Sequence, residues 1–188
     1  MGILSRQQLM DIGFKSIGEN ILLSDKASIY GAANISIGSN VRIDDFVVLS
    51  AGKSGIEIGN YIHIAIFSSL IGEGKISLSD FCNISSRVSV YSSNDDYSGS
   101  AMTNPMIPEK FKMVTHADVF IGRHALIGAA SVILPGIIIG EGAVVGALSL
   151  VNRSCAEFTI YAGVPIKKIK ARKRDLLNYE AEFALTGK

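Results

Sequence analysis

The sequence predicts an all-β solenoid made of stacked triangular coils. Three observations support this fold class: an aliphatic residue returns every six positions between residues 121 and 151, a second series with smaller residues runs two positions earlier, and glycine often follows the aliphatic residue. An α-helix repeats every 3.6 residues and a half-buried strand every two, so neither explains a strict period of six. The aliphatic series is Ile121, Ile127, Ile133, Ile139, Val145 and Val151, and the second is Val119, Ala125, Ser131, Ile137, Ala143 and Ser149.

Each group of six residues is expected to supply one short strand and one tight turn. Three such groups close a triangle whose aliphatic side chains point inward, and successive coils stack ~4.8 Å apart with their backbone groups paired. Because glycine tolerates positive φ, we expect the glycines after the aliphatic residues to open the corners. These glycines are Gly122, Gly128, Gly140 and Gly146.

The same repeat is present further upstream. Interruptions at residues 51–55 and 72–75 shift its register, as expected for residues added at a corner. We therefore predict coils over residues 17–90 and 119–160. The upstream aliphatic residues are Ile29, Ile35, Val41 and Val47 with companions Ile37, Ile43 and Leu49, followed by Ile58, Ile64 and Leu70 and then by Leu78, Ile84 and Val90.

Residues 91–118 interrupt the repeat. Loops of this length in a compact domain are usually functional, so we expect an extended loop that projects from one corner and contributes to a site.

The period changes again near the end of the chain. The apolar residues Ile169, Leu176, Leu177, Phe183 and Leu185 predict a helix with one apolar side over residues 166–185. Pro165 near its start supplies the fixed φ that a first helical turn accepts. A repeat stack needs its open end covered, and this helix is the predicted cover.

Composition limits the class of protein. The 188 residues and one repeat pattern predict a single domain over 1–188. The mean hydropathy is +0.34, yet no stretch approaches the ~18–20 apolar residues of a spanning helix. No signal sequence is visible, so we predict a cytoplasmic protein. A net charge of +1 argues against a nucleic-acid partner, and Cys82 and Cys155 are predicted to be small buried hydrophobes.

Two segments resemble a known family. The segment VFIGRHALIGAASVILPGIIIGEGAVVGA and the ending LVNRSCAEFTIYAGVPIKKIKAR resemble the hexapeptide-repeat acyltransferases, which implies a left-handed parallel β-helix over about residues 17–175. The stretches IDDF, YIHIAIFSSLIG and VSVYSSNDDYSG are similar to perosamine-type N-acetyltransferases of surface-polysaccharide (O-antigen) biosynthesis. The resemblance implies a homotrimer, acetyl-CoA in a groove between neighbouring prisms, and a nucleotide-linked 4-amino-4,6-dideoxyhexose near the extended loop.

Acetyl transfer from a thioester to an amine needs an unprotonated amine, an acceptor for its proton, and donors near the developing oxyanion. The chain has no Gly-x-Ser-x-Gly motif, which favours direct transfer without an enzyme nucleophile. The candidate catalytic residues are His63, Asp95 and Asp96. Galactoside-type relatives have their catalytic histidine at about residues 93–96, where this chain has none. Either one of the aspartates accepts the proton or orients the sugar amine, or the base is His63 or water. Alternatively, the two aspartates form an ordinary turn.

The remaining candidates are weaker. Residues of the same groove predicted to contact the substrate are Asn83, Ser85, Arg87 and Asn94. His116 is a less favoured candidate base, and His124 is predicted to be a solvated corner residue. The resemblance places acetyl-CoA near the small corner residues Ala129 and Ala147 and near Asn152 and Arg153, with its phosphates held by Lys168, Lys170 or Arg172. We predict no metal.

Three alternatives stay open. A sugar O-acetyltransferase uses the same fold with a hydroxyl acceptor. A non-catalytic β-helix scaffold subunit binds no acetyl-CoA. A γ-type carbonic anhydrase requires zinc on three histidines, but His116 and His124 are eight residues apart and His63 is remote.

Overall fold

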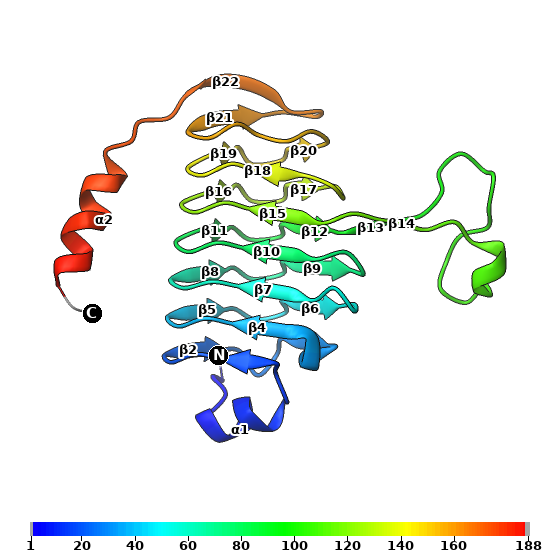
Figure 1. Cartoon of the computed structure of the whole chain (residues 1–188), viewed down its shortest axis with the longest axis horizontal. Coiled ribbons are helices and arrows are strands. Elements are labelled where there is room, and N and C mark those ends of the chain that lie inside the picture. The colour runs from blue at the N-terminus through cyan, green and yellow to red at the C-terminus, as the bar shows by residue number, and fades with distance from the viewer. Residues whose placement is uncertain (1, 187–188) are drawn as a thin grey trace.

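The chain folds into a triangular prism of parallel coils (Figure 1). The computed structural model describes residues 2–186, so the ends of the predicted domain, Met1, Gly187 and Lys188, lie outside the described residues. Three parallel sheets form the faces of the prism, and the chain visits them in the same order in every coil. This arrangement confirms the predicted solenoid of triangular coils.

The first sheet contains β1 (Ser16–Ile17), β4 (Ile35–Ile37), β7 (Ile56–Ile58), β10 (Ile76–Leu78), β15 (Val119–Ile121) and β18 (Ile138–Ile139). The second sheet contains β2 (Ile21–Leu23), β5 (Val41–Ile43), β8 (Ile62–Ile64), β11 (Asn83–Ile84), β16 (Leu126–Ile127), β19 (Val144–Val145), β21 (Thr159–Ala162) and β22 (Lys167–Ala171). The third sheet contains β3 (Ser28–Tyr30), β6 (Val48–Ala51), β9 (Ser69–Gly72), β12 (Ser89–Tyr91), β17 (Val132–Ile133) and β20 (Leu150–Val151). A short 3-10 helix, η1 (Ala32–Asn34), occupies a corner of an early coil.

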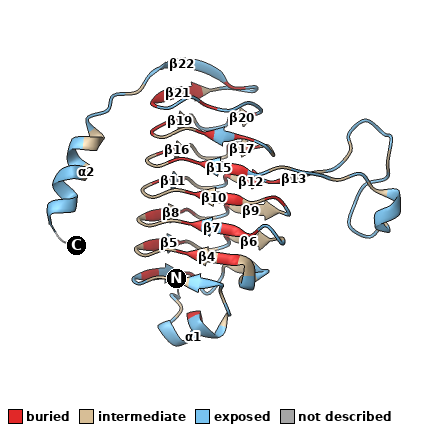
Figure 2. Cartoon of the chain, in the orientation of Figure 1, coloured by how far each residue is buried: buried red, intermediate tan, exposed pale blue. Residues whose placement is uncertain are grey.

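The aliphatic series forms the core, as predicted (Figure 2). Every residue of the series from Ile121 to Val151 has 0% of its surface exposed, and the companion series two positions earlier is buried as well. Burying one such aliphatic side chain stabilises the fold by about 1.5–3 kcal/mol. The buried serines of the companion series are satisfied: the hydroxyls of Ser131 and Ser149 both donate to the carbonyl of Gly146, at 3.0 and 2.7 Å.

The corners differ from the prediction. Gly122, Gly128, Gly140 and Gly146 do not adopt positive φ; the left-handed corner positions are held mainly by larger residues. At the corner between the first and second sheets these are Asn20, Asn40, Tyr61, Phe81, His124 and Phe158, and at the corner between the second and third sheets they are Phe46, Phe67, Arg87, Ala130 and Leu148.

Close stacking explains the repeat glycines instead. A Cβ atom on Gly128 would lie 2.4 Å from the backbone nitrogen of Ala147 in the next coil, and one on Gly140 would lie 2.7 Å from that of Glu157. Glycine is therefore required because the coils approach closely there. Positive φ costs each larger corner residue about 1–2 kcal/mol. Stacking between neighbouring coils offsets this cost, as between Phe46 and Phe67, whose ring centroids are 5.1 Å apart.

The extended loop leaves the prism between the third and first sheets. β13 (Ser93–Asn94) and β14 (Thr115–His116) pair antiparallel and form a stalk, and η2 (Glu109–Phe111) lies in the distal part. Figure 1 shows the loop projecting away from the prism on the side opposite the C-terminal helix. The prism continues undisturbed across this insertion, because β10 pairs directly with β15.

The two ends of the stack are covered differently from the prediction. At the first coil, α1 (Arg6–Asp11) begins with a capping box at Ser5 and packs Leu9 against the core. At the last coil, β22 turns back antiparallel on β21, and Ile166 is fully buried.

The predicted helix over 166–185 is therefore wrong in its first half, because residues 167–171 form β22. Only α2 (Leu176–Leu185) is helical, and it runs down the flank of the prism instead of covering its end (Figure 1). Within residues 2–186 no helix combines the length and the apolar character needed to cross a membrane. Cys82 and Cys155 are free and buried, as predicted, and burial raises the pKa of the Cys82 thiol to about 12.

Candidate active site

A row of polar side chains crosses the outer face of the second sheet. In the register of β5, β8 and β11, Arg42 lies beside His63 and His63 lies beside Asn83. Side chains of a strand alternate between faces, so the buried neighbours Ile62, Ile64 and Ile84 put these three residues on the outside. The sequence predicted that His63 projects from a coil face; this prediction is confirmed.

Asp44 joins this row from the end of β5. Its Oδ2 atom lies 2.8 Å from Nε2 of His63, and its Oδ1 atom accepts a hydrogen bond from Nε of Arg42 at 2.7 Å. Partial burial acts to raise the pKa of Asp44, but the bonds from Arg42 and His63 outweigh it and hold that pKa below its ordinary value. Asp44 lies in the IDDF stretch, but its role in the site was not predictable from the sequence, because it depends on a contact between neighbouring coils.

Ser85 and Arg87 follow β11 into the corner between the second and third sheets. The Ser85 side chain is half-buried, on the side of the corner nearest the polar row. The Arg87 guanidinium lies 5.1 Å from the centroid of the Phe67 ring, a cation–π contact. These residues and Asn83 therefore share the neighbourhood of His63, whereas Asn94 lies in β13 of the loop stalk.

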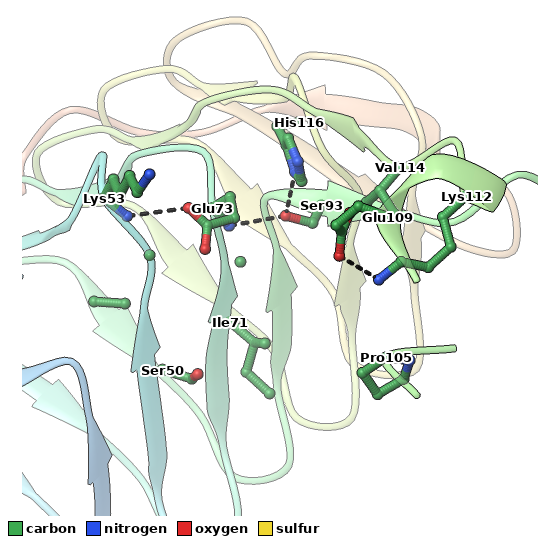
Figure 3. A pocket seen from close by; sticks show the side chains of 13 residues that line it. Ser50, Lys53, Ile71, Glu73, Ser93, Pro105, Glu109, Lys112, Val114 and His116 are labelled. Atoms are coloured by element: carbon green, nitrogen blue, oxygen red, sulfur yellow. Dashed lines mark hydrogen bonds and ion pairs between the residues drawn. The ribbon is translucent and has the colours of Figure 1, made fainter. Parts of the chain in front are cut away.

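A cleft of about 650 Å³ opens at the base of the extended loop (Figure 3). Nδ1 of His116 lies 2.8 Å from Oγ of Ser93, and that oxygen also accepts the backbone N–H of Glu73 at 2.8 Å. The Lys112 ammonium pairs with Glu109 at 2.6 Å although only 8% of the Lys112 side chain is exposed. The lining comprises Ser50, Ala51, Gly52, Lys53, Ile71, Gly72, Glu73, Ser93, Pro105, Glu109, Lys112, Val114 and His116.

The pairing of Ser93 with His116 was not predicted from the sequence. The two residues face each other because β13 and β14 pair across 23 positions of chain, and no periodic signal marks a two-residue strand.

The two candidate aspartates of the loop have different surroundings. Asp96 accepts hydrogen bonds from the hydroxyl and the backbone N–H of Ser98 and from the N–H of Ala101, and these bonds lower its pKa. Asp96 thus organises the turn. Asp95 is exposed, and its carboxylate makes no hydrogen bond or ion pair within residues 2–186, so it is free to meet a ligand.

The predicted coenzyme residues lie in three places. Ala129 and Ala147 stack at the corner between the second and third sheets, whereas Asn152 and Arg153 are exposed beyond β20. Lys168 and Lys170 are exposed on β22. Arg172 is used inside the chain: its Nη1 donates to the carbonyls of His124 and Gly142, at 2.8 and 3.0 Å. This contact ties the last strand to the prism.

His124 is not the solvated corner residue that the sequence predicted. Only 12% of its side chain is exposed, and its Nε2 lies 2.6 Å from Glu180 of α2. Its ring stacks on Phe81 with centroids 5.1 Å apart. The prediction failed because the position of α2 along the flank was not visible in the sequence. Within residues 2–186 no group of three or more His, Cys, Asp or Glu side chains could hold a metal ion.

Comparison with known proteins defines the class. The family described as "Bacterial transferase hexapeptide (six repeats)" matches residues 118–153. A dTDP-4-amino-4,6-dideoxy-D-glucose acyltransferase of Escherichia coli is 54% identical over 183 residues, covering 97% of this chain and 95% of that protein. The chain therefore belongs to the hexapeptide-repeat acyltransferases, and its fold is the left-handed parallel β-helix, as the sequence predicted.

Solved structures of an N-acyltransferase are similar to this chain over almost its whole length. AntD, an N-acyltransferase from Bacillus cereus solved with dTDP and 3-hydroxybutyryl-CoA, is 49% identical, with a TM-score of 0.94 and coverage of 98% of this chain and 97% of that one. A variant of AntD in which one serine is replaced by cysteine was solved with dTDP-4-amino-4,6-dideoxyglucose and coenzyme A. A putative lipopolysaccharide O-acetyl transferase of E. coli K12 is 32% identical, covering 79% of this chain and 74% of that protein.

Proposed function

We propose that this protein transfers an acyl group from acyl-CoA to the 4-amino group of dTDP-4-amino-4,6-dideoxy-D-glucose. The observation that carries this proposal is the 54% identity, over 97% of the chain, to an acyltransferase for that sugar nucleotide. The sequence alone favoured a nucleotide-linked 4-amino-4,6-dideoxyhexose and left the nucleotide and the epimer open. The relatives' substrate and ligands support dTDP as the nucleotide, the D-glucose configuration and an acyl-CoA donor that includes but is not restricted to acetyl-CoA.

In the proposed reaction the sugar amine attacks the thioester carbonyl directly. The C–N bond forms, the C–S bond breaks, the amine proton passes to His63, and the leaving thiolate of CoA takes that proton up. Asp95 is exposed and makes no ion pair within the described residues, and it is the proposed partner of the sugar amine before transfer. The loop leaves the prism at the corner opposite the second sheet, so in this proposal Asp95 and Asn94 come from one protomer of a homotrimer and His63 from its neighbour. Asn83, Ser85, Arg87 and Asn94 are the proposed substrate contacts, and Asp96 supports them by ordering the turn.

The coenzyme is proposed to lie along the upper coils. Ala129 and Ala147 present small side chains at a corner where an extended pantetheine arm can approach the backbone. Lys168 and Lys170 provide exposed ammonium groups for the phosphates. Asn152 and Arg153, beyond β20, are proposed as further contacts of the coenzyme. Arg172 has a structural role in the chain, so we propose the two lysines as the phosphate ligands.

A homotrimer is proposed as the working form. At the corner between the second and third sheets, Phe46 is 47%, Phe67 46% and Leu148 71% exposed. Such a line of exposed apolar side chains along one edge of the prism is typical of a surface that another protein covers. Light scattering after size exclusion tests this proposal, because a 20.0 kDa chain should elute at about three times that mass.

We also propose a cytoplasmic location and a place in surface-polysaccharide biosynthesis. Free, buried cysteines are typical of reducing compartments. The proposed donor and acceptor, an acyl-CoA and a nucleotide sugar, are soluble metabolites, and no nucleic-acid or membrane partner is proposed.

The decisive experiment is a mass-spectrometric assay with the purified protein. The acceptors are dTDP-4-amino-4,6-dideoxy-D-glucose, its 3-amino isomer and the corresponding 4-hydroxy sugar, each with acetyl-CoA and with 3-hydroxybutyryl-CoA. One added acyl group on the 4-amino sugar, stable to mild base, supports the proposal. A base-labile product on the hydroxy sugar would instead indicate an O-acyltransferase. The absence of product and of calorimetric CoA binding would indicate a scaffold subunit.

A further inference from the structure

The side chains of Arg42, Asp44 and His63 form a continuous polar chain. The guanidinium of Arg42 holds one carboxylate oxygen of Asp44 at 2.7 Å, and the other oxygen holds Nε2 of His63 at 2.8 Å. The two ends of this chain are more exposed than its middle: 50% of the Arg42 side chain and 41% of the His63 side chain are exposed, against 13% for Asp44. The carboxylate is thus the inner member.

The coil geometry fixes this arrangement. β5 and β8 place Arg42 directly beside His63. The backbone N–H of Asp44 donates to the carbonyl of Ile64 at 3.0 Å, so the residue is tied to the coil that contains the histidine. A largely buried carboxylate is stable only when its oxygens are paired, and Arg42 and His63 provide that pairing.

The contact determines which nitrogen of the imidazole can accept a proton. An ionised carboxylate can only accept hydrogen bonds, so the Nε2 atom of a neutral His63 must be protonated and donate to Asp44. The lone pair is then on Nδ1. The neighbours of the ring are Arg42 and Asp44 on the β5 side and the uncharged amide of Asn83 on the β11 side. Among residues 2–186, Asp44 is the only acidic side chain bonded to the imidazole.

We infer that Asp44 is a positioning residue that fixes the tautomer of His63, so that Nδ1 accepts the proton released by the attacking amine. This inference rests on the proposed function, in which His63 is the proton acceptor. Arg42 acts indirectly on His63, because its hydrogen bond goes to the Asp44 carboxylate and orients it. In the step itself one N–H bond of the amine breaks, an N–H bond forms at Nδ1, and the proton then passes to the thiolate of CoA.

The first test needs no substrate. In protein labelled with ¹⁵N-histidine, two-bond proton–nitrogen correlations distinguish the two neutral tautomers, and a His63→Gln variant identifies the signal among the three histidines. We expect the Nε2-protonated tautomer at His63 at pH 8. The Nδ1-protonated tautomer, or a mixture of both, would overturn the inference whatever the enzyme's activity.

The second test compares two neighbouring aspartates. In Asp44→Asn, Arg42 still holds the amide oxygen, which turns the NH₂ group towards His63 and favours the wrong tautomer. Asp45→Asn is the matched control, because Asp45 occupies the same corner but contacts Ser24 and Lys26 instead of His63. We expect kcat to fall at least about 10-fold in the Asp44 variant, because the wrong tautomer leaves no lone pair on Nδ1 to accept the amine proton, and to change less than about twofold in the control.

The tautomer separates positioning from a loss of structure. The same ¹⁵N measurement should show the Nδ1-protonated tautomer at His63 in Asp44→Asn and the Nε2-protonated tautomer in Asp45→Asn. Equal kcat values or the same tautomer in the two variants would refute the role of Asp44. If the wild-type protein acylates no aminosugar nucleotide, the proposed function fails, and the tautomer measurement still decides the structural part.

Discussion

Replacing Gly128 with alanine tests the close packing of the coils. The new Cβ atom would lie 2.4 Å from the nitrogen of Ala147, 2.7 Å from the carbonyl carbon of Gly146 and 2.8 Å from the carbonyl oxygen of Val145. All three are backbone atoms, so neither coil can relieve the clash by rotating a side chain. The coils must separate by about 1 Å to restore the ~3.5–4 Å separation of non-bonded carbon atoms.

The loss of stability in Gly128→Ala comes from the hydrogen bonds that this separation of the coils weakens. The two coils share hydrogen bonds from the N–H of Gly128 to Val145 at 2.7 Å and from the N–H of Leu148 to Ala129 at 2.8 Å. Overpacking costs about 1–3 kcal/mol, and weakening a backbone hydrogen bond costs about 1 kcal/mol. We expect the free energy of unfolding to fall by about 2–4 kcal/mol and the melting temperature by about 5–15 °C.

Gly146→Ala is the matched control. It has the same place in the next coil, but its new Cβ would meet one close atom, the methyl of Ala162 at 2.9 Å, and the nearest backbone atom is 3.5 Å away. Its clash is therefore smaller than that of Gly128→Ala. Both variants gain the same small benefit of about 0.4–1 kcal/mol from a less flexible unfolded chain, so their difference reports the additional cost of the backbone clash at Gly128. Thermal and urea unfolding followed by circular dichroism measure it. Equal stability of the two variants would refute the packing explanation of the repeat glycines.

Three further predictions concern α2 and the extended loop. Phe183→Ala removes two edge-on ring contacts, with Tyr61 and Phe81, each about 0.5–1.5 kcal/mol; hydrogen exchange should rise across residues 176–185 and stay unchanged in the core strands. Burial lowers the pKa of His124 below its ordinary value of 6.5, so its stabilising contribution is present above 6.5 and is lost as the pH falls from there through the lower pKa of the folded protein. Helix exchange should therefore rise as the pH falls below 6.5 in the wild type and lose this dependence in His124→Gln. Asp95→Asn should lower turnover about 10- to 100-fold, the effect of losing a charged hydrogen bond, and should leave CoA affinity and melting temperature unchanged. Asp96→Asn should instead act by loosening the turn. Full turnover in both variants would show that the loop assignment is wrong.

The fold was largely predictable because every coil repeats the same packing problem. The side chain of Ile127 has the same kind of surroundings as those of Ile121 and Ile133. One six-residue pattern, applied to every coil, therefore predicts the three sheets and the buried serines. The corner conformations could not be predicted this way. Positive φ at Phe46 or Tyr61 is favoured by stacking on a residue about twenty positions away, and this contact exists only after the coils are assembled.

The candidate site was predictable only in part, for a related reason. His63 stands out as a histidine in an alternating strand, and the sequence shows that its side chain faces outward. Its pairing with Asp44 depends on the register between coils, and the pairing of Ser93 with His116 depends on a two-residue antiparallel ladder. The position of α2 depends on one aromatic and one acidic side chain, Phe183 and Glu180, which meet a corner more than fifty residues earlier.

The direct pairing of Ile76 with Val119 has a consequence for how this scaffold can be altered. The prism continues from one side of the insertion to the other in unbroken register, while the inserted segment stands on its own two-stranded stalk. Grafting a different segment between residues 92 and 117 should therefore leave the prism intact. Related proteins can diversify at this junction, keeping one stable body while exchanging the part that protrudes from it.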